Sequence, residues 1–498
     1  MKVEWKSEAL DCLAPVLQQL QSRELTQEMK LPEAMPDVGQ VLAAWGQGIL
    51  RGKQWQTDSV SCTGGVMVWV LYAPEDGSAP RTLEGWVPFQ LRWDLPEDTP
   101  EGVLRLECQA GMVDARSVSP RKLMLRVGVG VSVEAFAPMT ARVRQPSEVP
   151  PSVELLKTVY PMTLIREAGE KAFLLDEELS LPEGSAAPER ILCCTLSPRV
   201  TDEKVLSQRV VFRGVGKIHV LALSPEGKVE SREFSVSFSQ FDELAGEHSG
   251  EARVDFRLCV TSLEVEVSGG GLRLKCGLTA QYRITDRVPV ELVEDAYSPG
   301  RDLSLQWEKL EVPVVLDTRR ETLSREIRLP SSGGAGVDLS ALPALPVAER
   351  RGEGVELAFS GTVQLLSAGE DGTLSAASGR WEYRQNLACH ENARVFPSLP
   401  GAGDGTLLPG EGAVKLELPV SWTVTAREAL PQVAALEVGE EKPTTDGPSL
   451  ILRRAGGERL WDIAKATGST MSAIRQATGL EGEPAPNQML LIPLGVDS

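Results

Sequence analysis

The pentapeptide EMKLP at residues 28–32 returns as ELSLP at 178–182 and as EIRLP at 326–330. The three copies start about 150 residues apart, a period within which a whole domain fits. A match of five residues can arise by chance, so a second landmark with the same spacing is needed to establish a repeat.

The second landmark is an apolar run that follows each pentapeptide and ends in an acidic residue and a glycine. A glycine also precedes each run. The runs and their turn glycines are 66–72 with Gly77, 218–223 with Gly227, and 362–366 with Gly372. Two landmarks at a matched spacing predict three copies of one domain of about 145 residues.

The local pattern inside the copies is that of β-strands. Apolar and polar residues alternate in 123–127 (LMLRV) and 263–267 (LEVEV), and the glycines at 269–271 fit a hairpin turn. The third copy passes through a Gly/Pro-rich stretch, 397–412, to a single strand at 414–424. We therefore expect a mainly β chain of repeated antiparallel domains, the third of which is shortened and lacks one hairpin.

Composition narrows the classes of function. The chain has 498 residues, an apolar content of 42% and a net charge of −19, which fits several packed domains and disfavours nucleic-acid binding, because phosphate contacts need clustered Lys and Arg. No apolar run is long enough for a membrane span, and no apolar segment follows the first lysine as in a signal peptide. We expect no direct membrane insertion and a cytoplasmic location.

Residues for metal binding or catalysis are sparse in the sequence. The eight cysteines are scattered without a C-x-x-C pair, and His219, His248 and His390 lie far from one another. Neither G-x-S-x-G nor H-E-x-x-H occurs. The glutamates of the pentapeptides recur once per domain, as structural residues do. We predict a protein that is not an enzyme and has no catalytic, cofactor-binding or metal-binding residues.

The composition changes after residue 426. The segment 437–448 is rich in charge, Pro, Thr and Gly, which is typical of a flexible tether. Short strands are expected at 450–452 and 489–492, with two helices between them. The small C-terminal module is therefore predicted to have α+β structure in the order β-α-α-β.

The two expected helices have recognisable faces and ends. Leu460, Ile463 and Ala464 fall on one face of the first helix. Thr470 is a good N-cap for the second helix, and Gly479 is a good C-terminal stop. The apolar residues of both helices are expected to form the core of the module, with Trp461 among them.

The C-terminal module resembles the LysM domain. Residues 457–464 (GERLWDIA) resemble its Gly-Asp-Thr-Leu-Trp-x-Ile-Ala signature, and 487–493 (NQMLLIP) resemble its closing Gly-Gln-x-Leu-x-Ile-Pro. The chain departs from the pattern at Glu458-Arg459, at Thr478 and at Asn487. The resemblance covers about a tenth of the chain.

The repeats resemble the SPOCS domain. Residues 31–42 are similar to its Leu-Pro…Pro-Asp-Ile…Ile-Leu segment, and Ile191-Leu192 match its end in the second copy. SPOCS repeats followed by LysM are the architecture of the SipL-like family of spore morphogenesis proteins. This resemblance implies action in the mother cell at the forespore surface, through binding to the spore-coat morphogenetic ATPase.

With these resemblances, the expected domains can be given bounds. They are a first SPOCS-like β domain at 1–148, a second at 149–295, a third and shortened one at 296–430, a linker at 431–448 and the LysM domain at 449–498.

The LysM resemblance also implies a site. In that family a shallow groove between two loops binds N-acetylglucosamine glycans. The matching residues here are Gly456, Gly457, Glu458, Arg459, Leu480, Glu481 and Gly482. We expect this groove to dock onto a coat protein and the chain to be a coat-assembly scaffold. The alternative is a protein that binds peptidoglycan or spore-cortex glycan through the same groove, and export from the cell would favour it.

Overall fold

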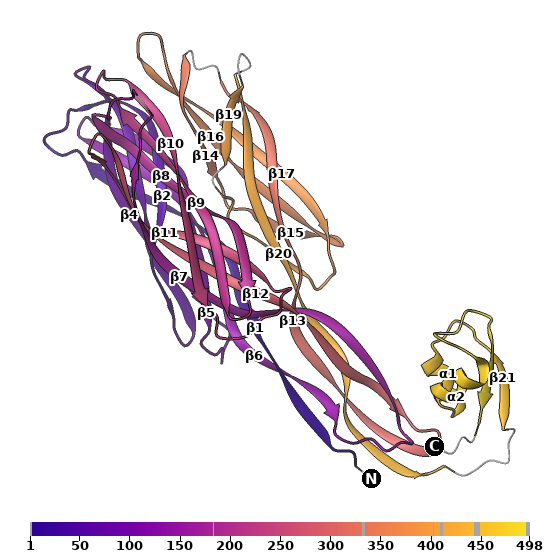
Figure 1. Cartoon of the computed structure of the whole chain (residues 1–498). Coiled ribbons are helices and arrows are strands. Elements are labelled where there is room, and N and C mark those ends of the chain that lie inside the picture. The colour runs from indigo at the N-terminus through magenta and orange to yellow at the C-terminus, as the bar shows by residue number, and fades with distance from the viewer. Residues whose placement is uncertain are drawn as a thin grey trace.

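The computed structural model describes residues 2–182, 184–330, 334–401, 403–408, 412–442 and 449–494. The chain is mainly β, as predicted, and forms several small antiparallel sheets (Figure 1). Its strands fall into three successive groups with related topology, which is consistent with the predicted repeats.

The first repeat consists of two three-stranded sheets, β1-β6-β5 and β2-β3-β4. The first and last strands of the repeat, β1 and β6, form a long antiparallel pair. The strands are β1 (Trp5–Lys30), β2 (Val38–Trp55), β3 (Ser59–Pro74), β4 (Arg81–Asp94), β5 (Val103–Ser119) and β6 (Lys122–Pro146).

The second repeat has the same two sheets, β11-β12-β7 and β10-β9-β8. Its strands are β7 (Glu154–Leu179), β8 (Arg190–Leu206), β9 (Arg209–Leu223), β10 (Val229–Glu243), β11 (Arg253–Ser268) and β12 (Gly271–Tyr297).

The third repeat follows this plan with two interrupted strands. Two short strands, β18 and β19, pair with β20 where β5 pairs with β6, and β14 and β15 together flank β16. The hairpin expected to be missing is therefore present in broken form. The strands are β13 (Arg301–Arg328), β14 (Ala335–Pro343), β15 (Val347–Arg351), β16 (Gly354–Ala368), β17 (Leu374–Ala388), β18 (Arg394–Pro397), β19 (Asp404–Leu408) and β20 (Ala413–Glu441).

The predicted boundary between the third domain and the linker was wrong. Strand β20 continues to Glu441 and pairs with β13 along its length, so 431–441 belong to the third domain rather than to a linker. The tether was predicted from the charge, Pro, Thr and Gly content of 437–448, a segment whose first residues lie within this strand. Residues 443–448 of the predicted linker lie outside the described residues.

Two local features fix the equivalence of the repeats. Gly77, Gly227 and Gly372 all have positive φ, at 74°, 80° and 81°, and close the predicted turns. In each long pair the first strand also has a residue without a partner at an equivalent position, at 16, 166 and 316. Such a β-bulge bends the strand and is a reliable landmark within a family of repeats. The unpaired residues are spaced like the pentapeptides.

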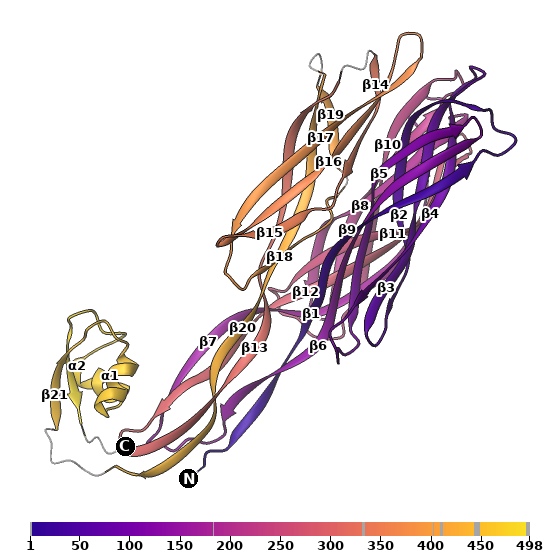
Figure 2. The same cartoon turned by 180° about the vertical axis from the view of Figure 1, so that it is seen from behind.

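The three repeats pack against one another through residues at equivalent positions. Cys12, Met162 and Val312, which occupy equivalent positions, share one buried cluster, and so do Leu10 and Leu310. At the opposite end of the body, a second cluster contains the equivalent residues Leu71, Leu221 and Leu366. Burial of apolar surface between repeats therefore joins them into one body (Figures 1 and 2).

The last elements are β21 (Leu450–Arg454), α1 (Leu460–Thr467), α2 (Met471–Thr478) and β22 (Met489–Pro493). Thr470 caps α2 by accepting a hydrogen bond from the backbone N–H of Ala473, and Gly479 ends α2 with φ of 69°. Leu460, Ile463, Ala464 and Ile474 are buried with apolar residues of β22. This C-terminal module lies beside the far end of the long strands (Figure 1).

Candidate binding site

The two loops predicted to form a groove meet at the start of α1. The backbone N–H of Leu460 donates to Glu483 Oε2 at 2.7 Å, which joins the loop before α1 to the segment after α2. Of the predicted groove residues, Gly456, Gly457, Arg459, Glu481 and Gly482 are exposed, whereas Glu458 and Leu480 are half-buried. The structure thus brings the two sets together.

The charged residues of the first loop are partly neutralised within the module. Glu458 accepts hydrogen bonds from the backbone N–H of Gly456 at 2.7 Å and from Arg453 at 2.6 Å. Bonds from backbone N–H groups hold the pKa of Glu458 below its usual range. Arg459 pairs with Asp462 at 3.1 Å. The loop therefore offers a polar, ion-paired surface.

Glu483 is a residue of the site that the sequence reasoning missed. The N-cap position of α1 is Arg459, whose side chain cannot accept a hydrogen bond from the helix. The free N–H of Leu460 is satisfied instead by Glu483, a carboxylate favoured at the positive end of a helix. Arg459 at the N-cap position could have indicated that the acceptor for the first N–H groups of α1 comes from another part of the chain.

The C-terminal module is held against the end of the second repeat. Trp461, predicted as core of the module, is buried, but its ring packs edge-on against Tyr297 of β12 with centroids 4.7 Å apart. Its Nε1 donates to Asp295 at 3.0 Å, and Lys465 pairs with the same carboxylate at 2.6 Å. The Tyr297 hydroxyl donates to the carbonyl of Ser469 at 2.9 Å.

This attachment leaves the candidate groove beside the repeat body. Asp462 is the main cause of the raised pKa of Arg459, and Glu294 of β12 contributes as well. Glu294 sits at a register shift of β12, between Val293 and Asp295. A bulge at the end of the second repeat therefore directs Asp295 toward the module.

Between the first two repeats lies a buried network of charged residues. Arg105 donates to Asp255 at 2.9 Å and lies 3.6 Å from Glu134, and Arg283 lies 3.4 Å from Glu134. Arg105 and Asp255 are equivalent in the two repeats, as are Glu134 and Arg283, so each position carries the opposite charge in the other copy. Two of these pairs, Arg105 with Asp255 and Arg283 with Glu134, therefore join different repeats, whereas Arg105 and Glu134 both belong to the first repeat.

The electrostatics of this network follow from its burial. Burial alone would raise the pKa of the Asp255 carboxyl, but the guanidinium groups of Arg257, Arg105 and Arg283 hold it far below its usual range. Perturbed carboxyls also occur in active sites, yet every charge here has an opposite partner and little exposure. The arrangement is one of structural ion pairs.

A second buried contact joins all three repeats at the other end. His219 Nε2 of the second repeat lies 2.6 Å from Asp338 of the third, and Trp45 Nε1 of the first donates to the same carboxylate at 3.2 Å. Burial opposes the charged form of His219, but the hydrogen bond to Asp338 and its charge outweigh it and raise the pKa. This joint is a second ionic tie between the repeats.

Among the described residues, no group of three or more His, Cys, Asp or Glu is placed to hold a metal ion. No helix of the described part of the chain is both long and apolar enough to cross a membrane.

Comparison with known proteins gives no relative. No family model, curated protein or solved structure matches the chain.

Proposed function

We propose that this chain is a non-enzymatic scaffold for assembly of the spore coat, and that its LysM-like C-terminal module docks onto a coat morphogenetic protein, the ATPase of the coat base, in the mother cell. One observation carries the proposal: a single small module exposes two adjoining loops while Trp461 and Lys465 hold it on a large body of packed repeats. A body that presents one docking module has the form expected of an assembly factor.

The polar character of the loops supports a protein partner. Arg459 is exposed and Glu481 lies on the facing loop, so the pair presents both signs of charge. No tryptophan or tyrosine is among the groove residues, although aromatic rings are frequent contacts for flat, apolar ligand faces. Complementary charges favour specific association with another protein.

The test reverses a charge on each loop of the full chain, Arg459→Glu with Glu481→Lys. Both side chains are exposed, and the ion pair of Arg459 with Asp462 is a surface pair, so folding stability should change by less than about 1 kcal/mol. Capture of the purified coat ATPase should weaken by about tenfold or more. Arg454→Glu on β21, also exposed, is the matched control and should bind as the unchanged chain does.

The outcomes separate the two functions. Unaltered capture by the double variant would rule out docking through these loops. Sedimentation of the unchanged chain with purified peptidoglycan, without capture of the ATPase, would instead establish the glycan-binding alternative.

A further inference from the structure

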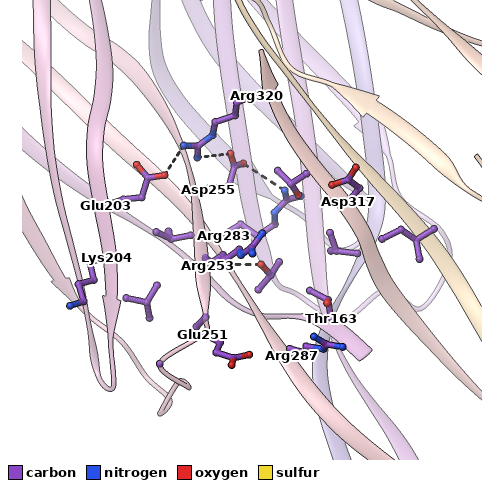
Figure 3. Close-up of a pocket in the computed structure, with 18 of the residues that line it drawn as sticks. Thr163, Glu203, Lys204, Glu251, Arg253, Asp255, Arg283, Arg287, Asp317 and Arg320 are labelled. Carbon is purple, nitrogen blue, oxygen red and sulfur yellow. Dashed lines mark hydrogen bonds and ion pairs between the residues drawn. The ribbon is translucent and has the colours of Figure 1, made fainter. Parts of the chain in front are cut away.

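A cavity of about 900 Å³ lies between the second and third repeats. It is bounded by β8, β11 and β12 of the second repeat and by β13 of the third, around residues 315–320 (Figure 3). The junction between the first and second repeats is built from equivalent strands, so the two junctions can be compared position by position.

The first junction is filled by two large side chains that the second junction lacks. Phe136 is fully buried, and Arg166 reaches across to donate to the carbonyl of Asp11. By register, Thr285 takes the place of Phe136, and Leu316, which is 48% exposed, takes the place of Arg166. The loss of a phenyl ring and a guanidinium group at equivalent positions accounts for the hollow.

The walls of the hollow have also changed from apolar to polar. Val103, opposite Phe136, corresponds to Arg253, opposite Thr285. The pair of Leu13 with Pro138 corresponds to the pair of Thr163 with Arg287. A packing defect would leave apolar walls, so the polar replacements indicate a surface suited to a polar ligand.

The cavity has an excess of positive charge that the protein itself does not neutralise. Among the described residues, no carboxylate lies within ion-pair distance of Arg253, Arg287 or Lys204, and all three are exposed. Figure 3 shows Arg287 beside Thr163, with Lys204 on the far side. Glu251 is the one lining carboxylate likewise without an ion pair in the described structure. In a chain of net charge −19, this is a local attractor for anions.

A buried arginine adds a further positive charge to the cavity wall. Arg283 lines the cavity with its side chain 1% exposed, and its terminal nitrogens bind Glu134 and Thr423. Its Nε is buried and has no hydrogen-bond partner among the described residues. The Nε of Arg105, in the same ion network, is likewise without a partner among the described residues, so the ligand contacts are expected from the exposed Arg253 and Arg287.

The shape of the cavity favours an extended peptide over a small anion. Strand β13 is the outer strand of its sheet, so one side of its backbone is free of strand pairing beside Leu316. Val205, Val254 and Leu316 supply apolar wall, and none of the described lining residues is aromatic and able to stack on a base. We propose that this cavity binds an extended acidic peptide segment of a partner protein, with Arg253 and Arg287 as its main carboxylate contacts.

The experiment is fluorescence anisotropy of the full chain with a fluorescein-labelled peptide of alternating glutamate and leucine residues. The double variant Arg253→Ala with Arg287→Ala should bind about tenfold or more weakly, because two partly exposed arginine–carboxylate contacts are lost. Added salt should weaken binding to the unchanged chain and have less effect on the variant.

Arg427→Ala is the matched control. Arg427 occupies in the third repeat the position of Arg287 in the second, but it pairs with Glu311 at 3.5 Å and lies outside the cavity. This variant should bind the peptide as the unchanged chain does. Equal affinity of the unchanged chain and the double variant would overturn the proposal. So would full competition by inorganic tripolyphosphate at the peptide's own concentration, which would reveal a simple anion site.

Discussion

The buried network between the repeats makes a sharp prediction for the variant Asp255→Asn. Asp255 lies 2.9 Å from Arg105, 3.4 Å from Arg320 and 3.6 Å from Arg283. Asparagine has nearly the same volume as aspartate, so no cavity is created, and the change removes the charge and replaces one acceptor oxygen by an NH2 donor. Arg105 and Arg283, whose side chains are both 1% exposed, are then left to share the carboxylate of Glu134.

The expected loss of folding stability is about 3–5 kcal/mol, the typical cost of removing one partner from a buried ion pair. The control is Asp58→Asn. Asp58 binds Arg92 at 3.3 Å, but its side chain is 75% exposed, so its loss should cost less than about 1 kcal/mol. The pair of variants compares the same chemical change in a buried and in an exposed site.

The assay is urea unfolding at pH 7, followed by tryptophan fluorescence. Since a chain of several repeats can unfold in steps, the first transition is the one to compare. A shift for Asp255→Asn as small as that for Asp58→Asn would refute the conclusion that the network holds the first two repeats together. Replacement of Arg105 and Asp255 by Met and Leu should cost much less than the single change, because it leaves fewer unpaired charges in the interior.

Two further predictions concern the other joints of the molecule. The pKa of His219 is raised in the folded chain, so its pairing with Asp338 stabilises the fold at low pH and stops doing so as the pH rises through that pKa. As the pH is raised from about 6 to 9, the unfolding midpoint of the unchanged chain should therefore fall relative to that of His219→Gln. Parallel plots of midpoint against pH for the two proteins would contradict this. Asp295→Ala removes the acceptor of Trp461 and Lys465, so attachment of the C-terminal module should weaken roughly tenfold or more, seen in solution scattering as a larger maximum dimension; an unchanged profile would mean that Tyr297 alone suffices.

Part of the fold follows directly from local patterns in the sequence. The pentapeptides at 28–32, 178–182 and 326–330 fall at the ends of β1, β7 and β13, because the proline after each leucine cannot continue a paired strand. The turn glycines adopt the positive φ that their acidic-Gly context indicates. Such features depend on a few neighbouring residues and can therefore be predicted.

The packing of the repeats could not be derived in the same way. Repeats are found by similarity, but their junctions depend on residues that differ, as Arg105 differs from Asp255 and Glu134 from Arg283. The opposite charges at equivalent positions could have indicated ion pairs between repeats. They do so only when it is known that these positions face each other in the folded chain. For the C-terminal module, Trp461 was assigned to the core because burial within a module and burial against a neighbour leave the same apolar pattern.

The charges at the junctions also explain why the repeats assemble in one order. Lys53 of the first repeat pairs with Glu170 of the second at 2.6 Å, and at the next junction the equivalent positions are Glu203 and Arg320, again 2.6 Å apart. The earlier repeat therefore supplies the cation at the first junction and the anion at the second junction. A second repeat packed on another copy of itself would set Glu203 against Glu170, and a first repeat would set Lys53 against Leu20, so self-association is penalised by repulsion or by an unpaired charge. These charges thereby favour packing of the three repeats within one chain over packing between repeats of two chains. The proposed contacts with other proteins lie beside these junctions, in the cavity that Glu203 and Arg320 border, and on the C-terminal module.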